Sequence, residues 1–158
     1  CSLRRRMIEL FISCVLTLPI STDTLQEYVI CRDVKEKVQH VEEWIPTVST
    51  YFKEEDIVQA MTIIYCESSG RYTAYNDKNK NGSNDLGLWQ FNNLTWDWLS
   101  NKLSIKDNRV NPVVSTRVAS WLVYNDGWHH WNSSKECWKN AEHIYRPKRN
   151  KSMGDTAS

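Results

Sequence analysis

The sequence is poor in net charge, in metal-type cysteine spacings and in long apolar runs, and each shortage excludes a class of function. Its 158 residues carry 20 Lys and Arg against 19 Asp and Glu, a formal net charge of +1. This balance gives no overall positive field for binding nucleic acid. No CxxC pair and no Cys/His pair has the spacing of a zinc site. His129 and His130 are adjacent, so we expect their side chains to diverge at the surface rather than share a metal ion.

One apolar run lies near the N-terminus. Three arginines at residues 4–6 precede mostly apolar residues that end at small ones, which is typical of a secretory signal. The run is too short to span a bilayer comfortably. A buried N-terminal helix is the alternative, because Glu9 interrupts the run. We therefore predict a signal or N-terminal extension over residues 1–22, a secreted protein, and no stable membrane insertion after signal cleavage.

The rest of the chain is long enough for one domain with a sizeable core. Apolar residues recur at helical spacing over 23–45, where we expect Pro46 to end the helix, and again over 54–69, 93–104 and 112–126. Residues 71–86 lack this periodicity and predict a loop or a small irregular sheet. The pattern predicts a mostly α (α+β) domain over 23–146 and a disordered basic tail over 147–158.

Glu67 is the first residue with chemical interest. It lies on or beside the core-facing stripe of its helix, three residues after Ile64 and one turn before the helix ends. Burial penalises the charged carboxylate and raises its pKa, as a general acid at near-neutral pH requires. The alternative is a helix-terminal glutamate in a salt bridge.

Two later segments hold further polar and aromatic candidates. In the run DLGLWQFN at 85–92, Gln90 and Asn92 share one side of an extended chain, where amides suit sugar hydroxyls; backbone capping is the alternative. In the run YNDGWHHW at 124–131, a tryptophan beside Glu67 would raise the pKa of the acid. Core packing is the alternative for Trp128 and the preferred interpretation for Trp131.

The order of these segments carries a family resemblance. ESSG at 67–70, GLWQ at 87–90 and YNDG at 124–127 resemble the three motifs of soluble lytic transglycosylase domains. The same stretches are similar to animal (chicken-type) lysozymes, except that Asn84 replaces the Ser or Thr before the aspartate. The match covers roughly residues 55–138. It implies a lysozyme-like, α-rich fold with a cleft for peptidoglycan or chitin-like polymers.

The resemblance also implies roles for single residues. Glu67 would protonate the glycosidic oxygen, and Asp85 would be the second carboxylate. Gln90, Asn92, Tyr124 and Trp128 would line the site, with Tyr124 near the acid. The implied enzyme needs no cofactor, and we expect it to act as a monomer.

The two resemblances favour different reactions. The aspartate favours hydrolysis, whereas YNDG favours the transglycosylases, which close an anhydro sugar without a second carboxylate. We favour a muramidase that cleaves the β-1,4 bond between N-acetylmuramic acid and N-acetylglucosamine. A lytic transglycosylase is the second hypothesis, and a non-catalytic glycan- or calcium-binding module is the third.

Two remaining features concern calcium and cysteine. Residues 77–85 resemble the start of an EF-hand loop, but Leu88 occupies the twelfth position, where a glutamate is expected. A polar loop is the more economical interpretation. The lysozyme resemblance implies a disulfide between Cys66 and Cys137, with Cys31 as an alternative partner.

Overall fold

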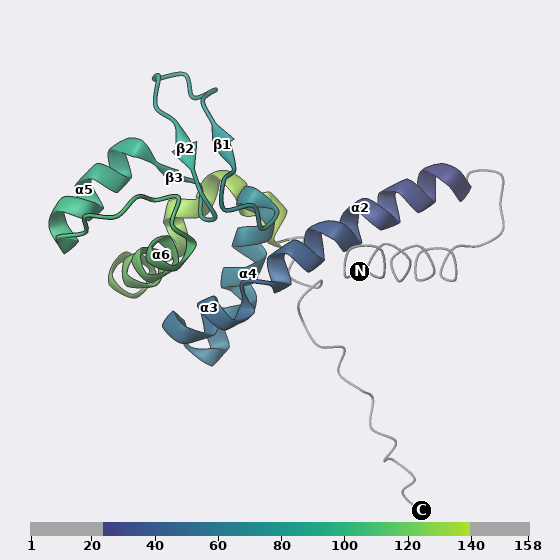
Figure 1. The fold of residues 1–158 in the computed structure, drawn as a ribbon, viewed down its shortest axis with the longest axis horizontal. Coiled ribbons are helices and arrows are strands. Elements are labelled where there is room, and N and C mark those ends of the chain that lie inside the picture. The colour runs from purple at the N-terminus through teal and green to yellow at the C-terminus, as the bar shows by residue number, and fades with distance from the viewer. Residues whose placement is uncertain (1–23, 140–158) are drawn as a thin grey trace, which may run out of the picture.

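The computed structural model describes residues 24–139 and the side chains from residue 32 onwards (Figure 1). The predicted signal segment and the predicted tail lie outside this range. The elements in chain order are α2 (Thr24–Glu42), α3 (Ile45–Tyr51), α4 (Glu54–Ser68), β1 (Tyr75–Asn76), β2 (Asp85–Leu86), β3 (Phe91–Asn92), α5 (Asn93–Leu103), α6 (Pro112–Asp126) and the 3₁₀ helix η1 (Trp128–Ser134). The mostly α prediction with a small sheet is confirmed.

The first predicted helix, over 23–45, ends earlier than expected, and a second short helix follows that the sequence did not predict. The first helix ends at Glu42, and α3 begins at Ile45 with Pro46 in its first turn. The expectation that Pro46 ends a helix is therefore wrong. Proline lacks an N–H group, and the first turn of a helix is where that group has no intrahelical partner, so Pro46 starts α3 instead.

The helices that flank the site have well-defined ends. Three acidic residues at 54–56 occupy the first turn of α4, where they complement the helix dipole. Helix α4 then ends in two residues with positive φ, Ser69 at 52° and Gly70 at 78°. Asn111 caps α6, since its side chain accepts hydrogen bonds from the backbone N–H groups of Val113 and Val114. These signals explain why both helices begin and end close to their predicted limits.

Residues 75–92 form a three-stranded antiparallel sheet in the order β1-β2-β3. Asp85 on the central strand is paired with Asn76 on β1 and with Asn92 on β3. Directly opposed residues of neighbouring strands lie side by side on one face of a sheet. The register therefore surrounds the aspartate with two asparagine side chains.

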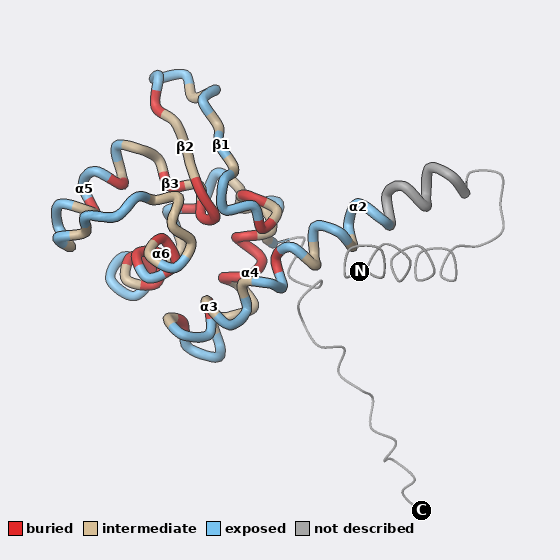
Figure 2. Tube along the Cα trace, viewed as in Figure 1, coloured by how far each residue is buried: buried red, intermediate tan, exposed pale blue. Residues whose placement is uncertain are grey.

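Trp89 is fully buried at the centre of the core, to which α4 and α6 also contribute buried residues. The buried segments of these helices can be followed in Figure 2. The ring of Trp89 stacks on Phe52 at 5.5 Å between centroids and packs against Trp131 at 5.4 Å. The indole N–H of Trp89 donates to the hydroxyl of Thr116. The indole N–H of Trp131 donates to the backbone carbonyl of Trp89. These contacts of Trp89 anchor the GLWQ segment to the core.

Arg109, in the loop between α5 and α6, ties the sheet to the helices. Its guanidinium donates to the carbonyl oxygens of Asn84 at 2.8 Å and Phe91 at 2.6 Å, and to the side-chain oxygen of Asn84. Gly87 approaches the same loop closely: a Cβ there would lie 2.5 Å from the Arg109 carbonyl oxygen. The turn before Trp89 therefore needs glycine for space as well as for its φ of 91°.

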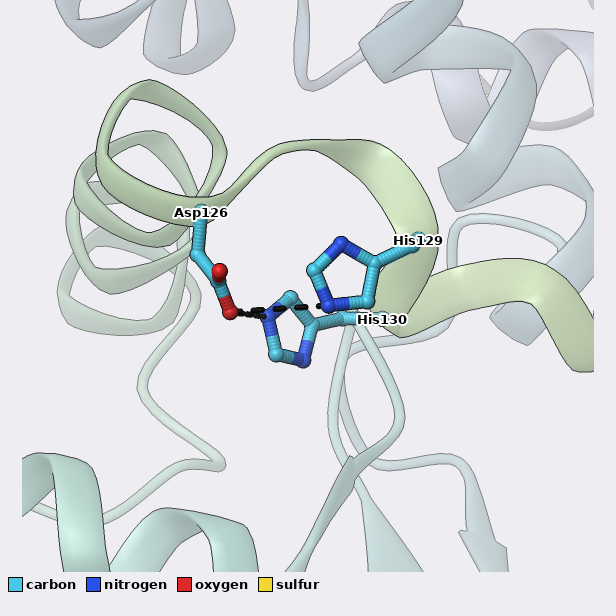
Figure 3. Close-up of side chains that lie close together, drawn as sticks. All are labelled: Asp126, His129 and His130. Atoms are coloured by element: carbon cyan, nitrogen blue, oxygen red, sulfur yellow. Dashed lines mark hydrogen bonds and ion pairs between the residues drawn. The ribbon is translucent and has the colours of Figure 1, made fainter.

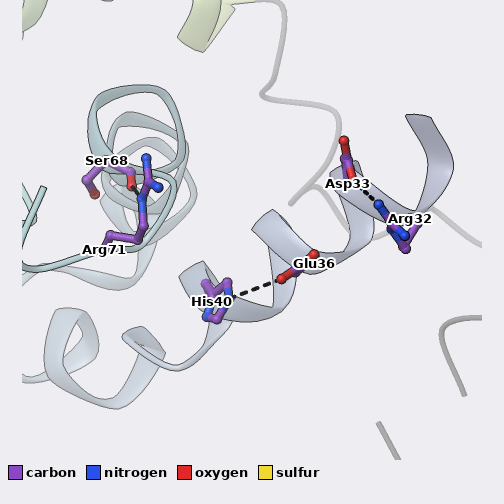
Figure 4. A network of polar contacts seen from close by, with 6 residues as sticks. All are labelled: Arg32, Asp33, Glu36, His40, Ser68 and Arg71. Carbon is purple, nitrogen blue, oxygen red and sulfur yellow. Dashed lines mark hydrogen bonds and ion pairs between the residues drawn. The ribbon is translucent and has the colours of Figure 1, made fainter. Parts of the chain in front are cut away.

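Helix α2 projects from the rest of the described chain (Figure 1). Its outer surface is charged, with Arg32 donating to Asp33 and His40 lying 4.0 Å from Glu36 (Figure 4). No helix among residues 24–139 has the length and apolar character needed to cross a bilayer.

Candidate active site

A cavity of about 490 Å³ opens beside the sheet and brings the two predicted carboxylates together. Glu67 and Asp85 both line it, although they lie on a helix and a strand that are separated by the polar loop. Gln90 and Asn92 line it as well. Four of the six residues that the sequence proposes for the site therefore share one cavity.

Glu67 is largely withdrawn from water near the end of α4. Burial raises the pKa of its carboxyl above the ordinary 4.5, and the negative charge of Asp85 raises it further, while a hydrogen bond from Ser134 lowers it. The net direction is upward. Its described partner is a hydroxyl rather than a cation, so the salt-bridge alternative does not apply.

Ser134 holds the acid in place. Its Oγ lies 2.5 Å from Glu67 Oε1 and 3.1 Å from the carbonyl oxygen of Trp131. A hydroxyl has one proton to donate and can also accept. When Glu67 is ionised, Ser134 donates to it. When Glu67 is protonated, the carboxyl can donate to Ser134, whose proton then goes to the carbonyl. The carboxyl is oriented in both protonation states.

The sequence offered no signal for this serine. It lies in the run WNSSKEC, where nothing in composition or spacing separates it from Ser133. Its hydroxyl reaches the acid because η1 packs against the end of α4 in the folded chain.

Asp85 is fixed by three asparagine amides. Asn76 and Asn79 each donate to its Oδ2 at 3.0 Å, and Asn92 donates to Oδ1 at 2.9 Å. An ionised carboxylate only accepts hydrogen bonds, so three donors and no acceptor suit the anion. The three amides hold the Asp85 carboxyl in a fixed orientation on the wall of the cavity that Glu67 also lines.

The loop before Asp85 uses its polar groups internally. Asn81 Oδ1 accepts hydrogen bonds from the backbone N–H and the hydroxyl of Ser83, and Asn79 donates to the same hydroxyl. The residues that resemble calcium ligands thus have a structural role: they shape the loop that presents Asp85.

Gln90 and Asn92 line the cavity, but their amide N–H groups are committed to the protein. Asn92 caps α5 through Leu94 N and donates to Ser83 and Asp85. Gln90, at a φ of 48°, donates to the carbonyls of Ala74 and Gly87. The capping alternative left open by the sequence therefore holds for Asn92, and both residues build the wall of the site.

The expected positions of Tyr124 and Trp128 differ from the structure. The Tyr124 hydroxyl accepts a hydrogen bond from Lys53 N and donates to Asp56 Oδ2 at the start of α4. Glu67 lies eleven residues further along that helix, a separation of roughly 16 Å at 1.5 Å per residue. Tyr124 therefore does not lie near the acid.

Trp128 belongs to the core instead of the cavity. Gly127 turns the chain with a φ of 89°, and the indole of Trp128 stacks on Phe52 at 5.7 Å. Trp131 is the tryptophan that lines the cavity, and it is also packed into the core, as expected. The turn at Gly127 explains why Trp131 and not Trp128 lines the cavity. It directs the indole of Trp128 toward Phe52 at the end of α3 and leaves the indole of Trp131 against Phe91 of β3.

The prediction that His129 and His130 diverge is also wrong. Their ring centroids are 4.2 Å apart, and both Nε2 atoms approach Asp126 Oδ2 (Figure 3). Among the described side chains, these three form the group of His, Cys, Asp or Glu whose ligand atoms lie within 4.8 Å of one another. His130 also lines the cavity that contains Glu67 and Asp85.

The disulfide between Cys66 and Cys137 is confirmed, with a Cα–Cα distance of 5.9 Å. Cys66 directly precedes Glu67, and Cys137 lies three residues after Ser134. The covalent bond therefore joins the two segments whose side chains meet in the Glu67–Ser134 hydrogen bond.

Comparison with known proteins identifies the family of the chain. A family model described as a lysozyme-like domain, of the SLT group, matches residues 47–151. No curated protein matches the chain. The matched region contains both carboxylates, the sheet, the disulfide and Ser134, and it covers well over half of the sequence. Such domains are a glycan-cleaving class, and this chain belongs to the lysozyme-like domain family.

Proposed function

We propose that this protein is a peptidoglycan muramidase. The observation that carries the proposal is the pair of unlike carboxyl groups in one cavity. Glu67 is desolvated with a raised pKa, and Asp85 is held by three amide donors. Two carboxyls that flank a glycosidic bond, one protonated and one ionised, are what acid-assisted cleavage requires.

In this mechanism Glu67 gives its proton to the glycosidic oxygen as the bond to the leaving sugar breaks. Positive charge then develops at the anomeric carbon. Asp85 acts there as nucleophile, as water-activating base or as electrostatic stabiliser. Ser134 donates to the new Glu67 carboxylate, which offsets part of the cost of its charge in a buried position.

Two observations favour water over internal anhydro closure as the final acceptor. Asp85 lies in the cavity, and transglycosylases generally lack this second carboxylate. Tyr124, the tyrosine of the YNDG motif, is bound at the opposite end of α4 from the acid. The motif that favours transglycosylation in the sequence is thus remote from the reacting group.

The proposal includes secretion. The disulfide that braces the acid requires an oxidising compartment, and peptidoglycan lies outside the cytoplasm. Both fit the signal-like pattern at residues 1–22.

The test is clearing of a bacterial cell-wall suspension by the purified chain, with wild type beside Glu67→Gln. We expect the variant to lose at least about 10²-fold in rate, because an amide cannot supply the proton. Glu54→Gln, an exposed carboxylate at the other end of the same helix, is the matched control and should retain full activity. If the folded wild-type protein binds the cell wall but does not clear the suspension, the muramidase proposal fails and the protein is a non-catalytic glycan-binding module.

Mass spectrometry of the released fragments separates the two reactions. Reducing ends that incorporate labelled oxygen from water support the muramidase. Anhydro-muramic ends would contradict the muramidase and indicate a lytic transglycosylase, with Glu67 still acting as the acid.

A further inference from the structure

The cluster at the end of α6 offers three metal ligands from two elements. Asp126 is the last residue of α6, and His129 and His130 lie in η1, on the far side of Gly127 (Figure 3). Asp126 Oδ2 lies 2.7 Å from His130 Nε2 and 3.5 Å from His129 Nε2. All three ligand atoms lie within 4.8 Å of one another.

The backbone accounts for this convergence. Gly127 leaves the helix with a φ of 89°, while its N–H still donates to Val123 O at 2.8 Å. The chain therefore turns without moving away from the end of α6. His129 and His130 then lie on the side that faces the Asp126 carboxylate.

We propose that Asp126, His129 and His130 form a binding site for a divalent transition-metal ion, and that Zn²⁺ suits it best. Two imidazoles and one carboxylate are a common zinc donor set, with a fourth position left to water. Ligand atoms around a tetrahedral zinc lie about 3.4 Å apart, which follows from metal–ligand distances near 2.1 Å. The 3.5 Å between His129 Nε2 and Asp126 Oδ2 already matches this separation. The 2.7 Å between His130 Nε2 and Asp126 Oδ2 needs to open by about 0.7 Å.

The site is accessible to solvent, and its one carboxylate lowers the net charge of the bound ion. The side chains of Asp126, His129 and His130 are 53%, 56% and 24% exposed, so an ion can enter from solvent. The carboxylate offsets half of the charge of a divalent ion. The hydrogen bond from His130 to Asp126 holds two ligands in place before the ion arrives.

An ion here would join α6 to η1 at the edge of the substrate cavity. His130 lines that cavity, and η1 carries Ser134, the partner of Glu67. The metal site itself does not depend on the proposed muramidase activity, so it is tested by binding and by thermal unfolding.

The experiment is calorimetric titration of ZnCl₂ into the tag-free chain after treatment with a chelator. We expect one ion per chain with micromolar affinity and an increase in Tm with added Zn²⁺, since the ion binds the folded state. His129→Ala, which removes an exposed ligand outside the cavity lining, should weaken binding by at least about tenfold and abolish the increase in Tm. Asp126→Asn should act in the same direction.

His40→Ala is the matched control, because His40 is an exposed histidine beside a carboxylate on α2. It should leave affinity and the increase in Tm unchanged. Co²⁺ should give the strong visible absorption of tetrahedral coordination in wild type and lose it in His129→Ala. The absence of saturable binding by folded wild type, or equal affinity in His129→Ala and His40→Ala, would overturn the proposal.

Discussion

At the scale of single residues, the hydroxyl of Ser134 orients the Glu67 carboxyl through a hydrogen bond. This hydrogen bond lowers the pKa of Glu67, whereas burial raises it, so a variant without the hydroxyl tests the two effects separately. In Ser134→Ala we expect the pKa of Glu67 to rise further, so the acid stays protonated to higher pH. The alkaline limb of the activity profile should move to higher pH, and the maximal rate should fall about tenfold through lost positioning. Rates of wall clearing across pH measure both.

Ser134→Thr is the companion variant, because it keeps the hydroxyl. It should restore the wild-type alkaline limb. An alkaline limb that stays in place in Ser134→Ala, with only a lower rate, would show that the serine acts through packing alone.

Glu67 also makes stability depend on pH. A carboxyl whose pKa is raised by folding stabilises the folded state below its ordinary pKa of 4.5. That contribution is lost as pH rises through the raised value. Glu67→Gln has no charge to bury, so at neutral pH its Tm should exceed that of wild type by a few degrees. The difference should close on acidification below the ordinary pKa. Thermal scans of both proteins from acid to neutral pH measure the gap, and a constant gap would contradict the argument.

At the scale of elements, the sheet and its turns position Asp85. Two glycines in these turns allow the cost of backbone strain to be compared with the cost of steric crowding. Gly87 and Gly82 both have positive φ, but a Cβ at Gly87 would meet the Arg109 carbonyl at 2.5 Å, while at Gly82 it would meet nothing within 4 Å. Gly82→Ala should therefore cost about 1 kcal/mol through strain. Gly87→Ala should cost about 3 kcal/mol because crowding is added.

Urea unfolding of the two variants gives both numbers. Equal losses would show that the Gly87 turn moves aside easily. The larger loss should come with lower activity, because the turn at Gly87 carries Gln90 and lies between Asp85 and the core.

At the scale of the whole molecule, the disulfide joins segments that are 71 residues apart in sequence. Closing a loop of this length restricts the unfolded chain, which contributes about 4 kcal/mol to stability in the chain-entropy account. The double variant Cys66→Ser with Cys137→Ser should lose about that amount in urea unfolding. A loss below about 1 kcal/mol would mean that the end of α4 and η1 are held together by packing alone. The double variant is used so that neither cysteine is left to pair with Cys31.

The sequence anticipated the features that depend on neighbours along the chain. The apolar spacing before Glu67, the capping residues of α6 and the motif order predicted the helices, the acid and the family. It misplaced Pro46, because proline is equally compatible with a helix that ends before it and with one that starts there. The disulfide was anticipated only through resemblance to lysozymes.

Side-chain partners that lie far apart in sequence were decided by the tertiary structure. Ser134 reaches Glu67 across 67 positions. Tyr124 lies away from the acid because α6 brings its hydroxyl to Lys53 and Asp56 at the start of α4. Trp128 leaves the site, and His129 and His130 converge, because the Gly127 turn sets directions that no periodic pattern encodes. Local hydrogen bonds and apolar periodicity depend on short stretches of sequence, and these determined the elements and indicated Glu67 as the candidate acid. The surroundings of that acid depend on how α4, the sheet and η1 pack together, and only the folded chain decides them.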